Sequence, residues 1–185
     1  MCNFNYKNLK TMNPKNQINI FVVEDNKLFS HALKTDIENS FPNKGLKIFS
    51  FETGETFMNK FREEKPEVVI LDYHLNGKYS DAADGIQVLD WIKKVNPETN
   101  VIILTSDDHC DIALKSFKHG AFDYVVKTET KFRKINYALF NLFKVMEAKT
   151  DATRYKILLT GLSLCIALLV GGIIAIQIFE PSLLK

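Results

Sequence analysis

Between residues 18 and 149, short apolar runs alternate with segments in which apolar residues recur every three or four positions. The short runs are rich in β-branched residues and contain few polar positions, which is typical of strands buried on both faces of a parallel sheet. Five such runs predict five strands: Ile18–Val23, Leu46–Phe51, a run centred on Val68–Leu71, Val101–Leu104 and Tyr124–Val126.

The segments between these runs have the periodicity of amphipathic helices. The apolar positions of the first are Leu28, Phe29, Leu33, Ile37 and Phe41. Three similar segments follow, and the last predicted helix of the domain extends from about Thr130 to Lys149. The alternation of five strands with five helices predicts an α/β fold with a five-stranded, doubly wound parallel sheet and right-handed crossovers.

A different pattern begins at Ile157, because from there to Phe179 the chain has no charged residue. As a helix this stretch would be about 34 Å long, which is enough to cross the hydrocarbon core of a bilayer. A buried core helix and a peripheral partner-binding helix are the alternatives. A helix that is apolar all round needs complete burial, which the preceding domain does not offer, so we expect one transmembrane helix.

Basic residues predict the orientation of this span. Arg154 and Lys156 precede it, whereas only Glu180 and Lys185 follow. The positive-inside rule then keeps the preceding domain in the cytoplasm, as part of a single-pass protein of the cytoplasmic membrane. We expect five parts: a flexible arm (1–17), a globular domain (18–149), a basic juxtamembrane linker (150–156), the transmembrane helix (157–179) and a short tail (180–185).

Small residues recur every four positions in the span, at Ser163, Ala167, Gly171 and Ala175. Such a stripe lets two helices pack closely, but it is also ordinary transmembrane composition. A homodimer and a membrane-protein partner therefore both remain open.

Charge and cysteine content argue against several classes of protein. The formal net charge of +2 gives no support for nucleic-acid binding, and we expect none. The three cysteines are an odd number without paired spacing, so we expect neither a disulfide framework nor a zinc site, and a reducing compartment is favoured. The polar segment Met1–Gln17 lacks the apolar core of a signal peptide.

Chemically active side chains follow four of the five predicted strands. They are Glu24 and Asp25, Asp72, Thr105, and Lys127. Each has an ordinary alternative. Asp25 or Asn26 could cap the first helix and Thr105 or Ser106 the fourth, Lys127 could be a solvated amine and Asp72 a strand terminator. Because the carboxyl ends of parallel strands meet at one edge of the sheet, where open α/β sheets bind ligands, we expect the five to lie together.

The predicted cluster calls for a divalent cation. Two carboxylates about 4 Å apart repel each other by roughly 1–4 kcal/mol, and a third adds to the repulsion. Mg²⁺ prefers oxygen ligands and keeps several waters, so it fits two carboxylates and a backbone carbonyl. The metal and Lys127 would offset the charge of a phosphoryl group, and Asp72 would accept that group as an aspartyl phosphate.

The order of these residues resembles the receiver domain of two-component response regulators. The resemblance covers about residues 17–148 and includes the run from Gly120 to Lys127. It implies a receiver fold and signal transduction through a phosphorelay, in which a histidine kinase or phosphotransfer protein supplies the phosphoryl group. A receiver of this kind accepts the group and is not itself an enzyme, beyond removing its own phosphate.

The resemblance also implies a role for each matching residue. Asp72 would be the phosphoacceptor, and Glu24, Asp25 and the backbone carbonyl of His74 would complete a Mg²⁺ site with it. Thr105 would hydrogen-bond the phosphoryl group and Lys127 would form a salt bridge to it. Tyr124 occupies the position of the family's switch aromatic, whose rotamer follows the threonine.

Three positions depart from the family pattern. Glu24 replaces the commoner first aspartate, and Thr128 rather than proline follows Lys127. The loop from Asp72 to Asp84 is longer than usual, with Asn76-Gly77 in place of Met-Pro. We expect this lengthening to alter either kinase docking or phosphoryl lifetime.

Other functions fit these residues less well. A flavodoxin-like FMN binder needs a hydroxyl- and glycine-rich phosphate loop after the first strand, where this chain has Glu24 and Asp25. A haloacid-dehalogenase-like phosphatase needs a second aspartate two residues after the nucleophile, where this chain has His74. A membrane-bound scaffold that keeps the receiver fold without phosphorylation remains as the alternative from another class.

Overall fold

Five strands form one parallel sheet in the part of the chain that the structure describes. The structure is a computed structural model and describes residues 17–75, 83–107 and 109–179. The strand order is β2-β1-β3-β4-β5, and every neighbouring pair is parallel. The strands are β1 (Ile18–Val23), β2 (Leu46–Phe51), β3 (Val68–Asp72), β4 (Asn100–Thr105) and β5 (Asp123–Val126). The predicted α/β class and parallel sheet are confirmed.

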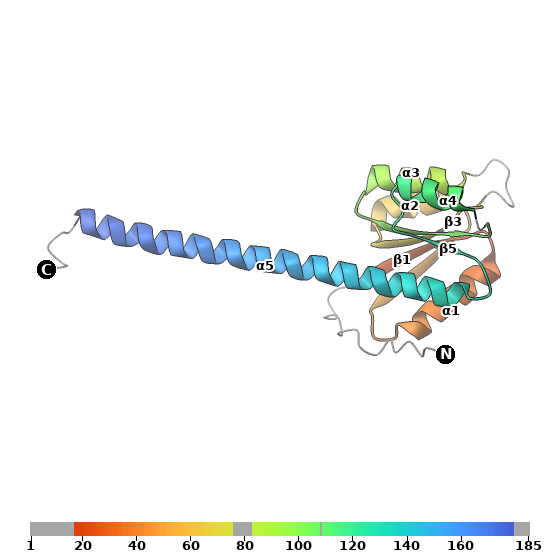
Figure 1. Ribbon diagram of the computed structural model, residues 1–185, viewed down its shortest axis with the longest axis horizontal. Coiled ribbons are helices and arrows are strands. Elements are labelled where there is room, and N and C mark those ends of the chain that lie inside the picture. Colours follow the sequence, from red (N-terminus) through yellow and green to blue (C-terminus); the bar gives the residue numbers. More distant parts are fainter. Residues whose placement is uncertain (1–16, 76–82, 108, 180–185) are drawn as a thin grey trace. The chain divides into compact units, whose positions relative to one another are not determined.

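Helices alternate with the strands and cover both faces of the sheet. They are α1 (Lys27–Ser40), α2 (Gly54–Glu64), α3 (Gly85–Val95), α4 (Cys110–Lys118) and α5 (Lys131–Phe179). Figure 1 shows α1 and the first turns of α5 on one face and α2, α3 and α4 on the other. The α1 and α5 helices are joined by Asn136, whose amide donates to Asp36 Oδ2 at 2.7 Å and to Ser40 Oγ at 2.8 Å.

Burial on both faces explains the continuous apolar runs of the inner strands. Every residue of β3 is buried, and so are the last five of β4. Successive side chains of a strand point to opposite faces. One set packs with α2 and α3 around Phe21, Phe57, Phe61, Leu89 and Ile92. One sequence expectation fails here: Leu28, which shares the apolar spacing of α1, is 84% exposed.

The α5 helix is longer than the sequence predicts. We expected the domain helix to end near Lys149, but the structure continues it without a break to Phe179. The intervening segment from Thr150 to Lys156 contains neither glycine nor proline, so nothing in it interrupts helical hydrogen bonding. The chain divides into two compact units, residues up to Leu139 and residues from Phe140 on.

One helix is long and apolar enough to cross a membrane, judged by its length and composition alone. It is α5, and no residue of its apolar window is buried in the part of the chain that the structure describes. The predicted N-terminal arm up to residue 16, the loop residues 76–82 and the tail from residue 180 lie outside the described residues.

Gly85 begins α3 directly behind the end of β3. A Cβ atom there would lie 2.6 Å from the carbonyl oxygen of Asp72 and 2.7 Å from the Cα of Tyr73, and both are backbone atoms that cannot turn aside. We therefore expect Gly85→Ala to lower the free energy of unfolding by about 1–3 kcal/mol. Urea denaturation of the full chain in detergent micelles measures this through the fluorescence of Trp91, the only tryptophan.

Gly45→Ala is the matched control for this substitution. Its Cβ would lie 3.9 Å from the Cα of Gln17, which is an ordinary contact. We expect its stability to stay unchanged or to rise slightly, because alanine restricts the unfolded chain more than glycine does. Equal losses in the two variants would contradict the close approach of Gly85 to the β3 backbone as the cause.

Candidate functional site

The strand register brings the predicted side chains to the same edge of the sheet. Val23 of β1 aligns with Leu71 of β3, so Glu24 and Asp72 follow at the same level. On the other side of β3, Asp72 aligns with Leu104, and Thr105 of β4 aligns with Val126 of β5. Lys127 follows Val126 directly, and its N–H donates to the Thr105 carbonyl at 2.7 Å.

The acidic side chains converge with Lys127 at this edge. Glu24, Asp25 and Asp72 each offer a carboxylate oxygen, and these oxygens lie within 4.8 Å of one another. Lys127 Nζ is 2.7 Å from Glu24 Oε2 and 2.8 Å from Asp72 Oδ2. Glu24 and Asp72 are 2% and 3% exposed, whereas Asp25 is half-buried. Lys127 is therefore the half-buried partner of two carboxylates and not a solvated surface amine.

The electrostatics of this cluster reflect its crowding. Burial and the neighbouring Asp72 raise the pKa of Glu24 to about 7, although Lys127 acts in the opposite direction. Burial by itself lowers the pKa of Lys127, but the carboxylates of Asp72 and Glu24 outweigh it, and the pKa is raised. The acidic groups thus need positive charge beside them to remain ionised together.

Thr105 is fully buried at the end of β4, and its hydroxyl accepts a hydrogen bond from the N–H of Asp107 at 3.1 Å. The Tyr124 hydroxyl donates to the carbonyl of the same Asp107 at 2.7 Å. The Asp107 carboxylate lies 2.9 Å from Nε2 of His74, and the N–H of His74 donates to Asp72 Oδ1 at 3.3 Å. Asp107 therefore connects Thr105, Tyr124 and the loop after Asp72.

Asp107 was not among the site residues that the sequence pattern predicted. Its position two residues after the strand-end Thr105 was the available signal, but a loop residue has no periodicity to mark it. The capping alternatives are also resolved by the structure. Asn26 caps α1, accepting from the N–H groups of Leu28 and Phe29, whereas α4 begins at Cys110, too far along the chain for Thr105 to cap it.

The donor set of this cluster fits Mg²⁺. It offers carboxylate oxygens only, which are the ligands that this hard cation prefers. Asp25 is half-buried, so the cluster is open to solvent on one side, as an ion that keeps several waters requires. Burial and then the neighbouring Asp72 carboxylate raise the pKa of Glu24, and a divalent cation beside these groups would favour their ionised forms.

Comparison with known proteins gives the family. The model of the response regulator receiver domain matches residues 20–138, well over half of the chain. The chain belongs to this family. The receiver domain thus accounts for the five-stranded sheet and for the acidic edge described above.

Similar proteins agree with this assignment. The DNA-binding transcriptional regulator NtrC of Escherichia coli (strain K12) is 29% identical over 108 residues, which are 58% of this chain and 21% of NtrC. The transcriptional regulatory protein ZraR of Klebsiella oxytoca is 31% identical over 111 residues, 60% of this chain and 23% of ZraR. The chain therefore spans only about a fifth of the length of these relatives.

Solved receiver structures cover the same region. The BeF3-activated receiver domain of DrrB is 31% identical, with a TM-score of 0.53, and the match covers 67% of this chain and 98% of that one. The signal receiver domain of a LuxO repressor protein from Vibrio parahaemolyticus is 27% identical, with a TM-score of 0.60 and coverage of 73% and 98%. Together with the family match, these structures establish the receiver fold for this chain.

Proposed function

We propose that this chain is a phospho-accepting receiver in which Asp72 takes up a phosphoryl group. The observation that carries the proposal is the arrangement around Asp72. Three carboxylates offer oxygens within 4.8 Å of one another, and the half-buried ammonium of Lys127 lies within 2.8 Å of two of them. Such a site combines a nucleophile with positive charge where the negative charge of a phosphoryl group would arrive.

In this proposal, a carboxylate oxygen of Asp72 attacks the phosphorus atom of a phosphohistidine on the donor protein. The bond from phosphorus to the imidazole nitrogen breaks as the new oxygen–phosphorus bond forms, and the nitrogen keeps the electron pair. Lys127, already 2.8 Å from Asp72 Oδ2, would turn toward the phosphoryl oxygens and offset their charge.

Mg²⁺ would be held by Glu24, Asp25 and Asp72, with the backbone carbonyl of His74 as the further ligand that the family resemblance implies. When bound, the ion would neutralise negative charge on the transferring group. The chain's own residues supply the hard oxygen donors and hold them together through the strand ends and the Asn26 cap that follows β1.

Thr105 and Tyr124 would transmit phosphorylation of Asp72 to the surface of the domain as a conformational change. The Thr105 hydroxyl can donate its proton to a phosphoryl oxygen while still accepting from the N–H of Asp107. Because Tyr124 donates to the Asp107 carbonyl, a shift of the Thr105–Asp107 segment would alter the position of the Tyr124 ring. This gives the switch role of Tyr124 a physical route.

The partners follow from this chemistry. A histidine kinase or phosphotransfer protein would donate the phosphoryl group, and the output would pass through protein–protein contacts with a membrane partner or a second copy of the chain. The rival candidate is a membrane-bound scaffold that never becomes phosphorylated. The complete set of acceptor, acidic and basic groups favours the phospho-accepting function.

We also propose that α5 anchors the protein in the membrane through residues 157–179. The segment has no charged residue, and the large apolar side chains that the structure describes in it are exposed, with Leu158 and Leu169 both at 68%. Water is a poor environment for so much apolar surface, whereas a bilayer removes it from water. The basic residues before the span favour a single-pass orientation with the receiver domain in the cytoplasm.

Phosphoryl uptake by the full chain tests the phospho-accepting function. In detergent micelles with acetyl phosphate and Mg²⁺, we expect the mass to rise by one phosphoryl group, and hydroxylamine to remove it as it does other acyl phosphates. Chelation of Mg²⁺ with EDTA should abolish uptake, because the crowded carboxylates then have no divalent cation. A folded chain that takes up nothing with Mg²⁺ present would support the scaffold instead.

A further inference from the structure

Lys127 has an aromatic neighbour besides its two carboxylates. Its Nζ lies 5.0 Å from the centroid of the Phe29 ring, within the range of about 6 Å in which a ring face attracts a cation. The Lys127 side chain is only 15% exposed, so little water competes for the ammonium. The half-buried ammonium of Lys127 thus contacts Glu24, Asp72 and the ring of Phe29.

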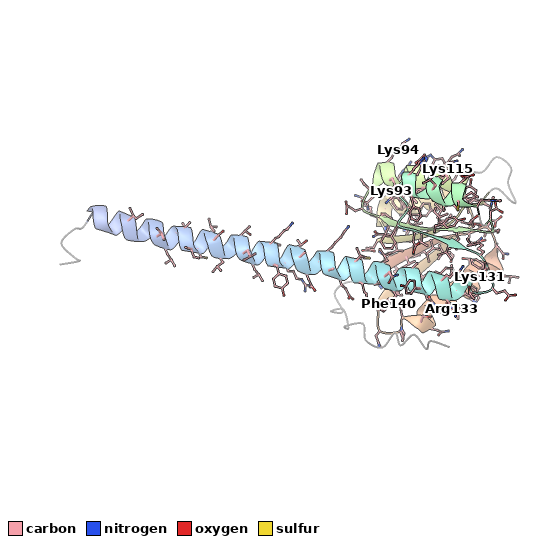
Figure 2. The ribbon with its side chains drawn as sticks, in the orientation of Figure 1. Lys93, Lys94, Lys115, Lys131, Arg133 and Phe140 are labelled. Atoms are coloured by element: carbon pink, nitrogen blue, oxygen red, sulfur yellow. The ribbon has the colours of Figure 1, made fainter. Side chains whose placement is uncertain are left out.

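The Phe29 ring is held in place from two directions. The backbone N–H of Phe29 donates to Oδ1 of Asn26, the N-cap of α1, at 3.1 Å. The ring stacks on Phe132 of α5, with 5.6 Å between centroids and 17° between planes. Lys131, in the first turn of α5 (Figure 2), places its Nζ 5.5 Å from the centroid of the same ring. Phe29 is therefore a fixed surface, built from α1 and α5.

The position of the Lys127 ammonium is not fixed by the adjacent residues in the chain. A lysine ammonium sits on a flexible four-carbon stem and can turn in several directions. Thr128 follows it without the ring constraint of a proline, and none of the described peptide bonds is cis. The carboxylates of Glu24 and Asp72 attract the ammonium. A fixed aromatic ring beside it would restrict its position when the Asp72 carboxylate reacts.

We propose that Phe29 is a positioning residue for Lys127, whose ring, stacked on Phe132, keeps the ammonium beside Asp72. The ring touches neither the donor nor the phosphoryl group in this account and acts only through Lys127. The inference rests on the proposed phosphoryl uptake for one of its two readouts. The other readout is independent of phosphorylation.

The first test replaces Phe29 with mono-, di- and trifluorinated phenylalanine in the full chain. Fluorine withdraws electrons from the ring face and weakens its attraction for a cation, while the ring's shape changes little. We expect the rate of phosphoryl uptake from acetyl phosphate to fall stepwise, by about 3- to 10-fold in total. Phe29→Tyr and Phe29→Trp should retain the rate, because both keep an electron-rich ring face.

The same fluorinated series at Phe57 is the control, because that ring packs against other phenylalanine rings in the core. We expect no graded change there. A rate that does not vary with fluorination at Phe29, or that falls equally at Phe57, would overturn the inference and reduce Phe29 to a packing residue.

The second test is a double-mutant cycle of Phe29→Leu and Lys127→Met, measured by urea denaturation through Trp91 fluorescence in detergent micelles. We expect coupling: the double variant should change the unfolding equilibrium constant about 2- to 10-fold less than the product of the single changes. Additive changes would overturn the inference. Coupling without phosphoryl uptake in the wild-type chain would leave the inference standing while the proposed function fails.

Discussion

Asp72→Asn is expected to reduce phosphoryl uptake from acetyl phosphate by a factor on the order of 100 or more, to the level of nonspecific labelling. The amide has nearly the shape of the carboxylate but is a poor nucleophile and forms no acyl phosphate. Lys127 keeps Glu24 as a partner at 2.7 Å, so the variant should remain folded. Intact mass spectrometry measures uptake, and circular dichroism measures folding.

Asp90→Asn is the matched control for this loss. Asp90 lies on α3 and pairs with His119 at 2.6 Å, so the same chemical change is made on the surface, away from the acidic edge. We expect wild-type uptake in this variant. Undiminished uptake in a folded Asp72→Asn chain would assign the acceptor to another residue, and equal losses in both variants would show that the assay reports general damage.

Leu164→Arg combined with Leu168→Arg is expected to release the full chain from the membrane. Each arginine near the centre of a span opposes insertion by about 2.5–3.5 kcal/mol, and each lost leucine removes a favourable contribution of a few tenths. Together the two changes exceed the several kcal/mol that favour insertion of the unmodified segment. Alkaline carbonate extraction followed by flotation on a density gradient separates membrane-inserted, soluble and aggregated chains.

Leu164→Phe combined with Leu168→Phe is the control, because it changes both side chains and keeps the segment apolar. We expect this variant and the wild-type chain to float with the membranes after carbonate treatment. Wild-type chain in the soluble fraction would contradict the transmembrane proposal and favour a helix that docks on a partner protein.

The central part of the sheet followed from the sequence because its inner strands are buried on both faces. Each inner strand therefore appears as an unbroken apolar run, and β3 is buried at all five positions. The same reasoning failed at the helix surfaces. Leu28 has the spacing of a core residue but is exposed, because one turn of a helix presents more apolar positions than the sheet covers.

The residue at which the last helix of the domain ends also could not be predicted from the local sequence pattern. A change from amphipathic to uniformly apolar composition near residue 157 indicates two segments with different surroundings. It does not indicate whether the backbone breaks between them, because residues 150–156 lack the glycine or proline that would require a break. The structure carries α5 continuously from Lys131 to Phe179.

By itself, the sequence determined the alternation of strands and helices, the apolar C-terminal segment and the residues that end the strands. Each of these features depends only on the polarity of residues that are close together in the chain. The sequence also predicted that the strand ends gather at one edge of the sheet, but only the tertiary structure decided the order of the strands and which side chains at that edge are in contact. The strand order places β3 between β1 and β4. This order brings Lys127 within 2.8 Å of both Asp72 and Glu24, although Glu24 is far from Lys127 along the chain. The roles of Asp107 and Phe29 likewise depend on contacts across the sheet edge, which no local pattern of polar and apolar residues encodes.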